Sequence, residues 1–232
     1  MKKAIIIGAS SGMGKELAKI LSEDNFAVGL MARREDLLSD LQKQLSTTAY
    51  IKKADVAKPE EAMALLEELI NEMDGTDIIV ISAGVGHGNR NLEWAKEKET
   101  IDINVSGFTA MADAAFKYFA DKGEGHIVGI SSIAAIRGNA AGPAYNASKA
   151  FVSNYLEGLR MKAKKSKLPI TVTDVQPGFV QTDMLKGKGL FWVSTPEKAA
   201  QQIYAAVKAR KNKAYITKRW RLIAWALKLG IK

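Results

Sequence analysis

The feature that most constrains the fold is a regular alternation of strand-like and helix-like segments along the 232 residues. Short runs of apolar, often β-branched residues alternate with longer segments whose apolar residues recur every three or four positions. The expected strands are residues 3–7, 27–32, 48–52, 77–81, 126–130, 169–175 and, weakly, 214–217. The expected helices are residues 13–23, 35–45, 59–73, 92–120, 144–165 and 196–209, with a break near Asn104 left open. The alternation predicts an α/β fold in which a parallel, doubly wound sheet of about seven strands has helices on both faces. This single domain would span residues 1–217, and residues 218–232 would form a basic amphipathic helix appended to it.

Composition narrows the class of protein further. The chain has no cysteine and two histidines, which excludes a disulfide framework and speaks against a metal site built from protein ligands. After a basic start, the first apolar run is cut short by Gly8, so it is predicted to be a strand rather than a signal peptide. No run approaches the ~20 apolar residues that span a bilayer. We therefore expect a cytoplasmic protein.

Tyr145 and Lys149 form the first candidate for catalysis. They lie four residues apart in a segment expected to be helical, so their side chains share one face. A fixed ammonium beside a phenol favours the phenolate, which would bring the pKa of the tyrosine down toward the range where a general acid works. Ser132 follows an expected strand at its carboxyl end, where open α/β sheets bind ligands, and its hydroxyl could hold a substrate oxygen. The alternative is an ordinary Tyr–Lys pair on a helix surface.

A glycine-rich turn follows the first expected strand. It reads Gly8-Ala9-Ser10-Ser11-Gly12-Met13-Gly14 and leads directly into a helix. Glycines in such a turn let a ligand approach the backbone closely, and the helix N-terminus can receive a dinucleotide pyrophosphate. The glycine spacing differs from the common Gly-x-Gly-x-x-Gly, and a plain structural turn is the alternative.

The residues at the end of the second strand indicate which dinucleotide binds. Folds that use NAD usually carry an acid there for the ribose 2′-hydroxyl, whereas an arginine accommodates the 2′-phosphate of NADP. Ala32 takes the place of the acid, and Arg33 and Arg34 follow, which favours NADP(H) over NAD(H). The alternative is that both arginines belong to a solvated helix start together with the two acids that follow.

Taken together, the motifs of this chain resemble those of the short-chain dehydrogenase/reductases over essentially its full length, which implies a Rossmann-type fold. The matching motifs are, in order, the glycine turn, Asp55-Val56 at the adenine, Ser82-Ala83-Gly84 after the fourth strand, Asn104, Ser132, Tyr145, Lys149 and the segment 177–182 at the nicotinamide. Ser82 stands where the family has an asparagine. The cofactor-binding residues that the resemblance implies are Gly8, Ser10, Ser11, Gly12, Met13, Gly14, Arg33, Arg34, Asp55, Val56, Ala83, Gly84, Tyr145, Lys149, Pro177, Gly178, Val180 and Thr182. Taken singly, Asn104 could cap a helix break, Thr182 could be an N-cap and Asp55 a turn residue.

The resemblance also implies a reaction, hydride transfer between a nicotinamide and a carbonyl carbon. Ser132 would bind the carbonyl oxygen and Tyr145 would protonate it. Lys149 would depress the pKa of Tyr145 and hold the nicotinamide ribose, while Asn104 and a water would restore the proton. His87 in a glycine-flanked loop is a weaker candidate for a second acid, because a loop histidine is commonly solvated or substrate-lining. The expected function is NADPH-dependent reduction of an apolar ketone or aldehyde.

Other functions stay open. A 3-oxoacyl-thioester reductase would use the same residues, and a regulatory protein that binds NADP without catalysis would not need them together. Sugar epimerases and dehydratases share the Tyr–Lys pair but usually carry a larger carboxyl-terminal domain than this chain offers. The expected substrate cover is an apolar lid, or alternatively a loop packed on the body, with Gly187 and Gly189 as mobile points and with Met184, Leu185, Leu190, Phe191 and Trp192 as its apolar residues.

The tail carries the charge of the protein. The net charge is +9, and nine cations without an acid lie between residues 208 and 232. Trp220, Ile223 and Leu227 form one helical stripe there, which predicts a helix that closes the substrate pocket or a subunit interface. The alternative is peripheral contact with an anionic membrane, which basic residues and tryptophans favour; nucleic acid is not expected. By analogy with the family, a homodimer or homotetramer would form through the helices at 92–120 and 144–165.

Overall fold

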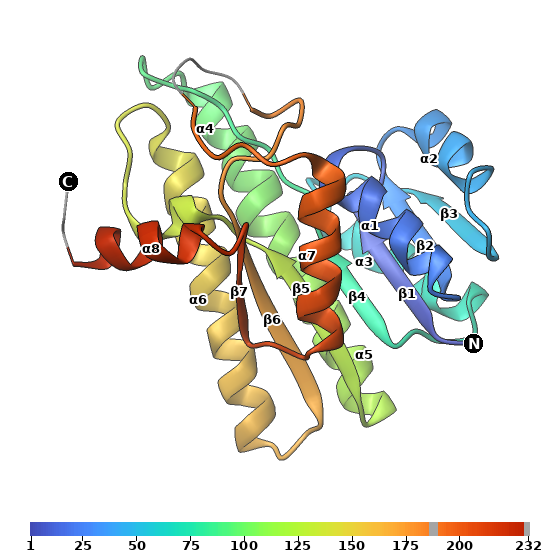
Figure 1. Ribbon diagram of the computed structural model, residues 1–232. Helices are drawn as coiled ribbons and strands as arrows, with labels where there is room; N and C mark the ends of the chain where they lie inside the picture. Colours follow the sequence, from blue (N-terminus) through green and yellow to red (C-terminus); the bar gives the residue numbers. More distant parts are fainter. Residues whose placement is uncertain (186–189, 230–232) are drawn as a thin grey trace.

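Seven parallel strands form one sheet in the order β3-β2-β1-β4-β5-β6-β7 within the residues that this computed structural model describes, 1–185 and 190–229 (Figure 1). The strands are β1 (Lys3–Ile7), β2 (Ala27–Ala32), β3 (Ala49–Lys53), β4 (Ile78–Ile81), β5 (Gly125–Ile130), β6 (Ile170–Pro177) and β7 (Lys213–Ile216). The helices are α1 (Gly12–Glu23), α2 (Glu35–Gln42), α3 (Pro59–Glu72), α4 (Trp94–Ile101), the π-helix η1 (Asp102–Gly107), α5 (Phe108–Lys122), the 3-10 turn η2 (Ile133–Ile136), α6 (Pro143–Lys165), α7 (Pro196–Lys208) and α8 (Trp220–Lys228). The predicted doubly wound sheet is confirmed.

The strand order places a crevice at the carboxyl edge of the sheet. The order runs outward from β1 to β3 on one side and from β4 to β7 on the other, so β1 and β4 are neighbours at a switch point. The connections that leave these two strands diverge to opposite faces, and open α/β sheets bind their ligands in the gap that results.

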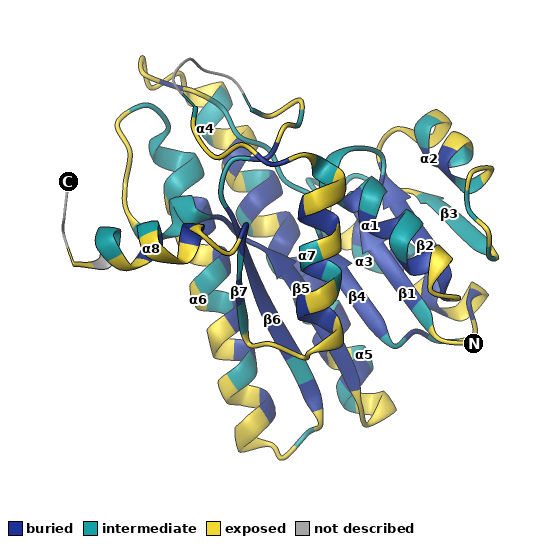
Figure 2. Ribbon diagram, in the orientation of Figure 1, coloured by how far each residue is buried: buried dark blue, intermediate teal, exposed yellow. Residues whose placement is uncertain are grey.

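Both faces of the sheet are covered because its strands are apolar on both sides. Alternate residues of β1 enter different cores: Ile5 and Ile7 pack with α3, α5 and α6, whereas Ile6 packs with α1, α2 and α7. Figure 1 shows α1 and α7 side by side over one face, and Figure 2 shows the strands between the layers as mostly buried, apart from the partly exposed edge strand β3.

The long helical segment predicted at 92–120 is interrupted. It begins only at Trp94: Leu92 has a left-handed backbone (φ +52°), and Glu93 N, just before the helix, donates a hydrogen bond to the side-chain oxygen of Asn89 (2.9 Å). The π-helix at residues 102–107 then separates α4 from α5 and contains Asn104, so the break left open from the sequence is present. Wide turns of this kind are rare in helices and occur frequently at functional sites.

The tail helix α8 lies beside β7 and the η2 turn, at the edge of the sheet (Figure 1). Gly187 and Gly189, predicted as mobile points, and the last three residues of the predicted tail helix lie outside the described residues. In the described part of the chain, every helix is too short or too polar to cross a membrane. The same residues contain no group of three or more histidines and acids arranged to hold a metal ion.

A buried histidine should make the stability of this fold depend on pH. His126 lies within β5, with its ring 2.8 Å from the hydroxyl of Thr173, and burial lowers its pKa to about 4. Since this value lies below that of the unfolded chain, stability is lost as the pH falls from about 6.5 toward about 4, because the unfolded state takes up the proton first. We expect the free energy of unfolding to drop by roughly 2–3 kcal/mol between about pH 7 and about pH 4.5, measured by urea denaturation.

The other histidine provides a matched control. His126→Gln should flatten this pH dependence, whereas His87→Gln, at a partly exposed position, should preserve it. If the free energy of unfolding of the His126 variant kept the same dependence on pH, the loss of stability at low pH would have to come from the carboxylates.

Candidate functional site

Most of the predicted site residues meet around two adjoining cavities at the carboxyl edge of the sheet. The larger cavity, about 720 Å³, borders the ends of β5 and β6, and the smaller, about 480 Å³, borders the ends of β1, β2 and β4. They share wall residues, among them Met13, Gly84 and Thr182, so together they form one elongated cleft.

The glycine turn forms the floor of the smaller cavity, and two of its glycines are sterically required. Gly8 has φ +94°, and a Cβ there would lie 2.5 Å from Ala83 N. A Cβ at Gly14 would lie 2.2 Å from the carbonyl oxygen of Gly8. The start of α1 can therefore pack tightly on the turn, and Ser11 at its N-cap position makes no capping hydrogen bond. Backbone N–H groups at such a helix start suit an anionic pyrophosphate.

The two arginines after β2 lie at the outer end of the smaller cavity. Arg34 Nη2 donates hydrogen bonds to the hydroxyls of Ser10 (3.0 Å) and Ser11 (2.9 Å), which holds its guanidinium over the turn. Arg33 also lines this cavity and is exposed. In the described part of the chain neither arginine forms an ion pair with a carboxylate. Arg34 is the N-cap residue of α2, whose first turn contains Glu35 and Asp36, so the interpretation of a solvated helix start stays open beside the binding interpretation.

The remaining predicted adenine residues follow β3. Asp55 Oδ1 accepts a hydrogen bond from Ala57 N (3.1 Å), which makes it a turn residue, and Asp55 and Val56 both line the smaller cavity. The turn interpretation is confirmed, and the place of Asp55 on the cavity wall is compatible with the binding interpretation.

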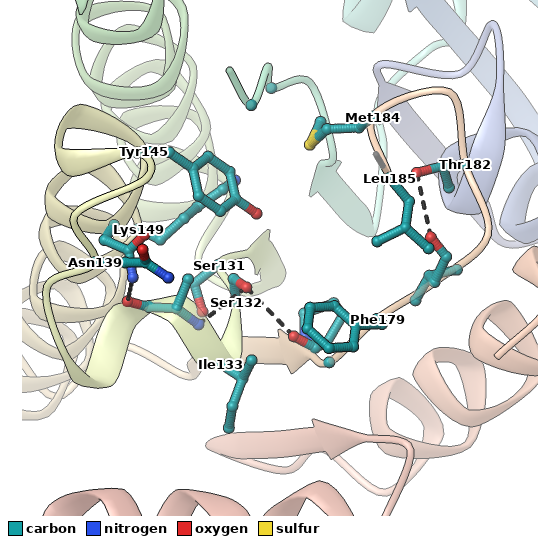
Figure 3. A pocket seen from close by; sticks show the side chains of 18 of the residues that line it. Ser131, Ser132, Ile133, Asn139, Tyr145, Lys149, Phe179, Thr182, Met184 and Leu185 are labelled. Carbon is teal, nitrogen blue, oxygen red and sulfur yellow. Dashed lines mark hydrogen bonds between the residues drawn. The ribbon is translucent and has the colours of Figure 1, made fainter. Parts of the chain in front are cut away.

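Tyr145, Lys149 and Ser132 come together on the wall of the larger cavity. Tyr145 and Lys149 lie one turn apart near the start of α6, with Lys149 Nζ 5.8 Å from the centre of the phenol ring. Ser132 lies two residues after the end of β5, and its hydroxyl accepts a hydrogen bond from Ala134 N (3.1 Å) at the start of η2. Figure 3 shows the hydroxyl of Tyr145 pointing into the cavity, across from Met184 and Leu185. A phenol, a hydroxyl and an ammonium thus face one space.

Burial shifts the pKa values of this group in opposite directions. It raises the pKa of Tyr145, and a hydrogen bond with Ser132 opposes part of this rise. It lowers the pKa of Lys149 to about 8, while the negative charge of Asp174 acts against it. The predicted downward shift of the tyrosine pKa is wrong, because desolvation of the phenol outweighs the hydrogen bond with Ser132.

Asn104 braces the cluster from the π-helix. Its side chain accepts from Val85 N (2.8 Å) and donates to Val85 O (2.8 Å) and to the hydroxyl of Ser148 (3.0 Å). A Cβ on Gly84 would lie 3.1 Å from Asn104 Oδ1 and 3.3 Å from Lys149 Nζ, so both side chains flank the same glycine. Asn104 and Gly14 are the predicted site residues that line neither cavity directly; they lie behind the walls.

A buried carboxylate behind the cluster escaped the sequence analysis. Asp174 is fully buried in β6 and accepts hydrogen bonds from the hydroxyls of Ser131 and Ser153 (2.7 Å for the latter) and from Gln176 Nε2 (2.8 Å). Lys213 Nζ lies 3.5 Å from it. The one acid in the strand Ile170–Pro177 was the available signal.

Residues after β6 form the apolar wall of the larger cavity. Pro177, Gly178, Val180 and Thr182 line it as predicted for the nicotinamide segment, and so do Met184, Leu185, Leu190 and Phe191 of the predicted lid. Trp192, the other predicted lid residue, does not line it.

The tail contributes to this wall. Trp220 and Leu227 of α8 line the larger cavity, and the Trp220 ring stacks on Phe191 (5.3 Å between centroids) and meets the edge of Phe179 (5.2 Å). A Cβ on Gly178 would lie 2.0 Å from the indole, so the tryptophan packs directly on the Pro-Gly segment. The tail helix therefore closes the pocket, as one of the sequence interpretations held.

His87 lines both cavities, but its ring points to a helix rather than to the tyrosine. His87 Nε2 lies 2.8 Å from Glu99 Oε2 on α4. This pairing suits a wall residue better than a second proton donor.

These residues fit a nicotinamide dinucleotide. A cradle that only glycine allows, an uncapped helix start and a cationic end lie in the smaller cavity, and the phenol and ammonium lie in the larger one.

Comparison with known proteins agrees with this geometry. Residues 2–190 match the family model for short chain dehydrogenases. An uncharacterized oxidoreductase of Myxococcus xanthus is 35% identical over 189 residues, which cover 79% of this chain and 74% of the relative. Among solved structures, a short-chain dehydrogenase from Sphingobium yanoikuyae in complex with NADPH superimposes with a TM-score of 0.83 at 23% identity, covering 100% of this chain and 95% of that one. The closed form of a serine dehydrogenase complexed with NADP+ gives a TM-score of 0.81 at 25% identity, with coverage of 92% and 93%. The chain is an oxidoreductase that belongs to the short-chain dehydrogenase family.

Proposed function

We propose that this oxidoreductase uses NADPH to reduce an apolar ketone or aldehyde to an alcohol, with Tyr145 as the proton donor. The observation that carries the proposal is the placement of Tyr145, Ser132 and Lys149 on one wall of a cavity whose opposite wall is apolar. The nicotinamide would supply the hydride when bound.

The side chains of the cluster have separate tasks in this proposal. Ser132 donates a hydrogen bond to the carbonyl oxygen, and Tyr145 transfers its proton to the same oxygen as negative charge develops there. The ammonium of Lys149, held by a hydrogen bond to Ile130 O (3.1 Å), stabilises the phenolate that remains and holds the ribose hydroxyls. Asn104 keeps the segment around Val85 in place and holds a water molecule through which a proton returns to Tyr145.

The walls of the larger cavity favour an apolar substrate. Phe179, Leu185, Leu190, Trp220 and Leu227 line this cavity together with Ser132 and Tyr145. A cavity of about 720 Å³ has room for a medium-sized ketone beside the nicotinamide. A 3-oxoacyl thioester is the second candidate, and a protein that senses NADP without turning it over is the third.

Oxidation of NADPH in the presence of a substrate panel tests the function. The panel contains medium-chain ketones, aldehydes, a diketone and a 3-oxoacyl thioester. Turnover of the ketones above the thioester would support the proposal, turnover of the thioester alone would favour the second candidate, and NADPH binding without turnover of any compound would favour the third.

The cofactor preference should reside in the arginines after β2. Arg33→Ala combined with Arg34→Ala should weaken NADPH binding by on the order of 100-fold, because charge-assisted hydrogen bonds to a phosphate are lost, and should leave NADH binding nearly unchanged. Titration of the fluorescence of each dinucleotide measures this directly.

Two other cations provide the control for this double substitution. Lys164→Ala with Lys165→Ala, at the distant end of α6, removes the same charge and should leave the NADPH/NADH ratio as it is. Equal losses for both dinucleotides in the arginine variant would contradict the proposed preference.

The proposed partners follow from the helices. A homodimer or homotetramer would form through α4, α5 and α6, where Phe151 and Met161 are exposed large apolar residues of α6. Peripheral contact with a membrane would use α8.

A further inference from the structure

The tail helix α8 has two apolar faces, of which the fold uses one. Trp220 and Ala224 are 3% and 1% exposed and pack inward, toward the cavity. Leu222, Trp225 and Leu229 are 68%, 64% and 58% exposed. These three side chains are three and four residues apart and lie on the side of the helix opposite Trp220. We refer to Leu222, Trp225 and Leu229 as the outer face of α8.

Cations accompany the outer face. Lys218, Arg219 and Arg221 are exposed at the start of the helix, and no acid occurs in the sequence after Glu197. A helix that exposes a tryptophan and two leucines beside several cations, with no acid of its own, has the chemistry of a surface that meets anionic headgroups and the outer acyl region.

The apolar surface continues toward the rim of the cavity. The guanidinium of Arg219 lies 5.2 Å from the ring of Trp192, and the exposed side chains of Phe191 and Trp192 adjoin this end of the helix. Phe191 also stacks on Trp220, which lines the cavity. The exposed face and the substrate cavity are thus connected through a short run of aromatic contacts, and Figure 2 shows α8 at the edge of the molecule.

We propose that the outer face of α8 docks on an anionic lipid bilayer. Leu222, Trp225 and Leu229 would lie at the boundary between headgroups and acyl chains, and Lys218, Arg219 and Arg221 would contact the anionic headgroups. If the proposed reduction of an apolar carbonyl is correct, this docking also brings the cavity rim next to the phase in which such a substrate accumulates; this last step rests on the proposed function, whereas the docking does not.

Co-sedimentation of the full chain with vesicles tests the docking without any turnover. The vesicles are phosphatidylcholine alone and phosphatidylcholine mixed with phosphatidylserine. The protein should pellet with the mixed vesicles, less with the neutral ones, and be released by salt. Leu222→Ala with Trp225→Ala should weaken binding at least about tenfold, and Lys218→Gln with Arg221→Gln by on the order of 30-fold.

The matched control removes the same charge elsewhere. Lys164→Gln with Lys165→Gln lies at the far end of the 23-residue helix α6 and should bind vesicles like the unmodified protein. Activity on a water-soluble ketone should persist in the outer-face variant, because neither Leu222 nor Trp225 lines the cavity. Activity lost only in the variant would indicate misfolding, whereas no activity in either protein would count against the proposed function and leave the vesicle result unaffected.

Three results would overturn the docking proposal. One is equal recovery in the pellet with and without mixed vesicles. Another is equal loss of binding in the control at Lys164 and Lys165, which would show attraction by net charge alone. The third is self-association in sedimentation velocity, without lipid, that Leu222→Ala with Trp225→Ala abolishes, because the outer face would then be covered by a second copy of the chain.

Discussion

Replacing Tyr145 by phenylalanine should lower kcat by on the order of 1,000-fold, because the substitution removes the proposed proton donor and little else. The phenyl ring keeps the packing of the tyrosine on α6, and the proposed contacts of NADPH with the glycine turn and Arg33 are untouched. NADPH affinity should therefore stay within a few-fold of the original value. Steady-state kinetics with the best ketone and fluorescence titration of NADPH measure the two quantities.

A second tyrosine on the same helix is the control. Tyr155 stacks on Phe151 with 5.6 Å between ring centroids, away from both cavities, so Tyr155→Phe should leave kcat nearly unchanged. If Tyr145→Phe retained a kcat within about tenfold of the original, the loss would fall below the range of general acid catalysis and another group would have to deliver the proton.

Asp174→Ala should lower the free energy of unfolding by about 3 kcal/mol or more. The change removes the acceptor of the Ser153 hydroxyl and one of two acceptors each of the Ser131 hydroxyl and the Gln176 amide, and it leaves Lys213 without its partner. A buried donor that loses its acceptor carries the full penalty of desolvation, and the buried ammonium of Lys149 loses the negative charge that acts on it. Urea denaturation measures the difference.

An exposed carboxylate of similar geometry provides the comparison. Asp113 lies 2.8 Å from Lys117 on the surface of α5, and Asp113→Ala should cost at most about 0.5 kcal/mol because water screens the pair. Equal stability losses at Asp113 and Asp174 would mean that the buried network contributes no more than a surface ion pair. Removal of Asp174 should also let the pKa of Lys149 fall further below about 8, since its charge now acts against that shift.

Local sequence patterns were enough to predict the strands, because each strand combines a short apolar run with a flanking turn. The glycine turn was recognised for the same reason: the backbone geometry requires glycine at Gly8 and Gly14, and glycines directly after an apolar run are visible in the sequence. Tyr145 and Lys149 share a face because of helical spacing alone. These predictions depend on neighbours within a few residues.

Features that depend on depth and on distant neighbours were not predictable in this way. The pKa of Tyr145 is the balance of burial against nearby charge, and spacing says nothing of burial. The network at Asp174 requires the pairing of β6 with β5 and β7 together with Ser153 from α6. The tail showed a broad apolar stripe, but only its packing on the cavity reveals that Trp220 points inward and Trp225 outward.

The proposed catalytic residues and part of the cavity wall lie in different parts of the chain, which bears on how relatives can differ. The family match ends at residue 190, so it includes the glycine turn, Ser132, Tyr145 and Lys149, whereas Phe191, Trp220 and Leu227 on the cavity wall come after it. The proposed proton donor and its neighbours thus lie within the part of the chain that matches the family, and part of the cavity wall lies beyond it. We expect relatives to differ in substrate specificity chiefly through differences in this last segment. A chimaera that carries the terminal segment of another family member should acquire the substrate range of that member, together with its tendency to bind or not to bind a membrane.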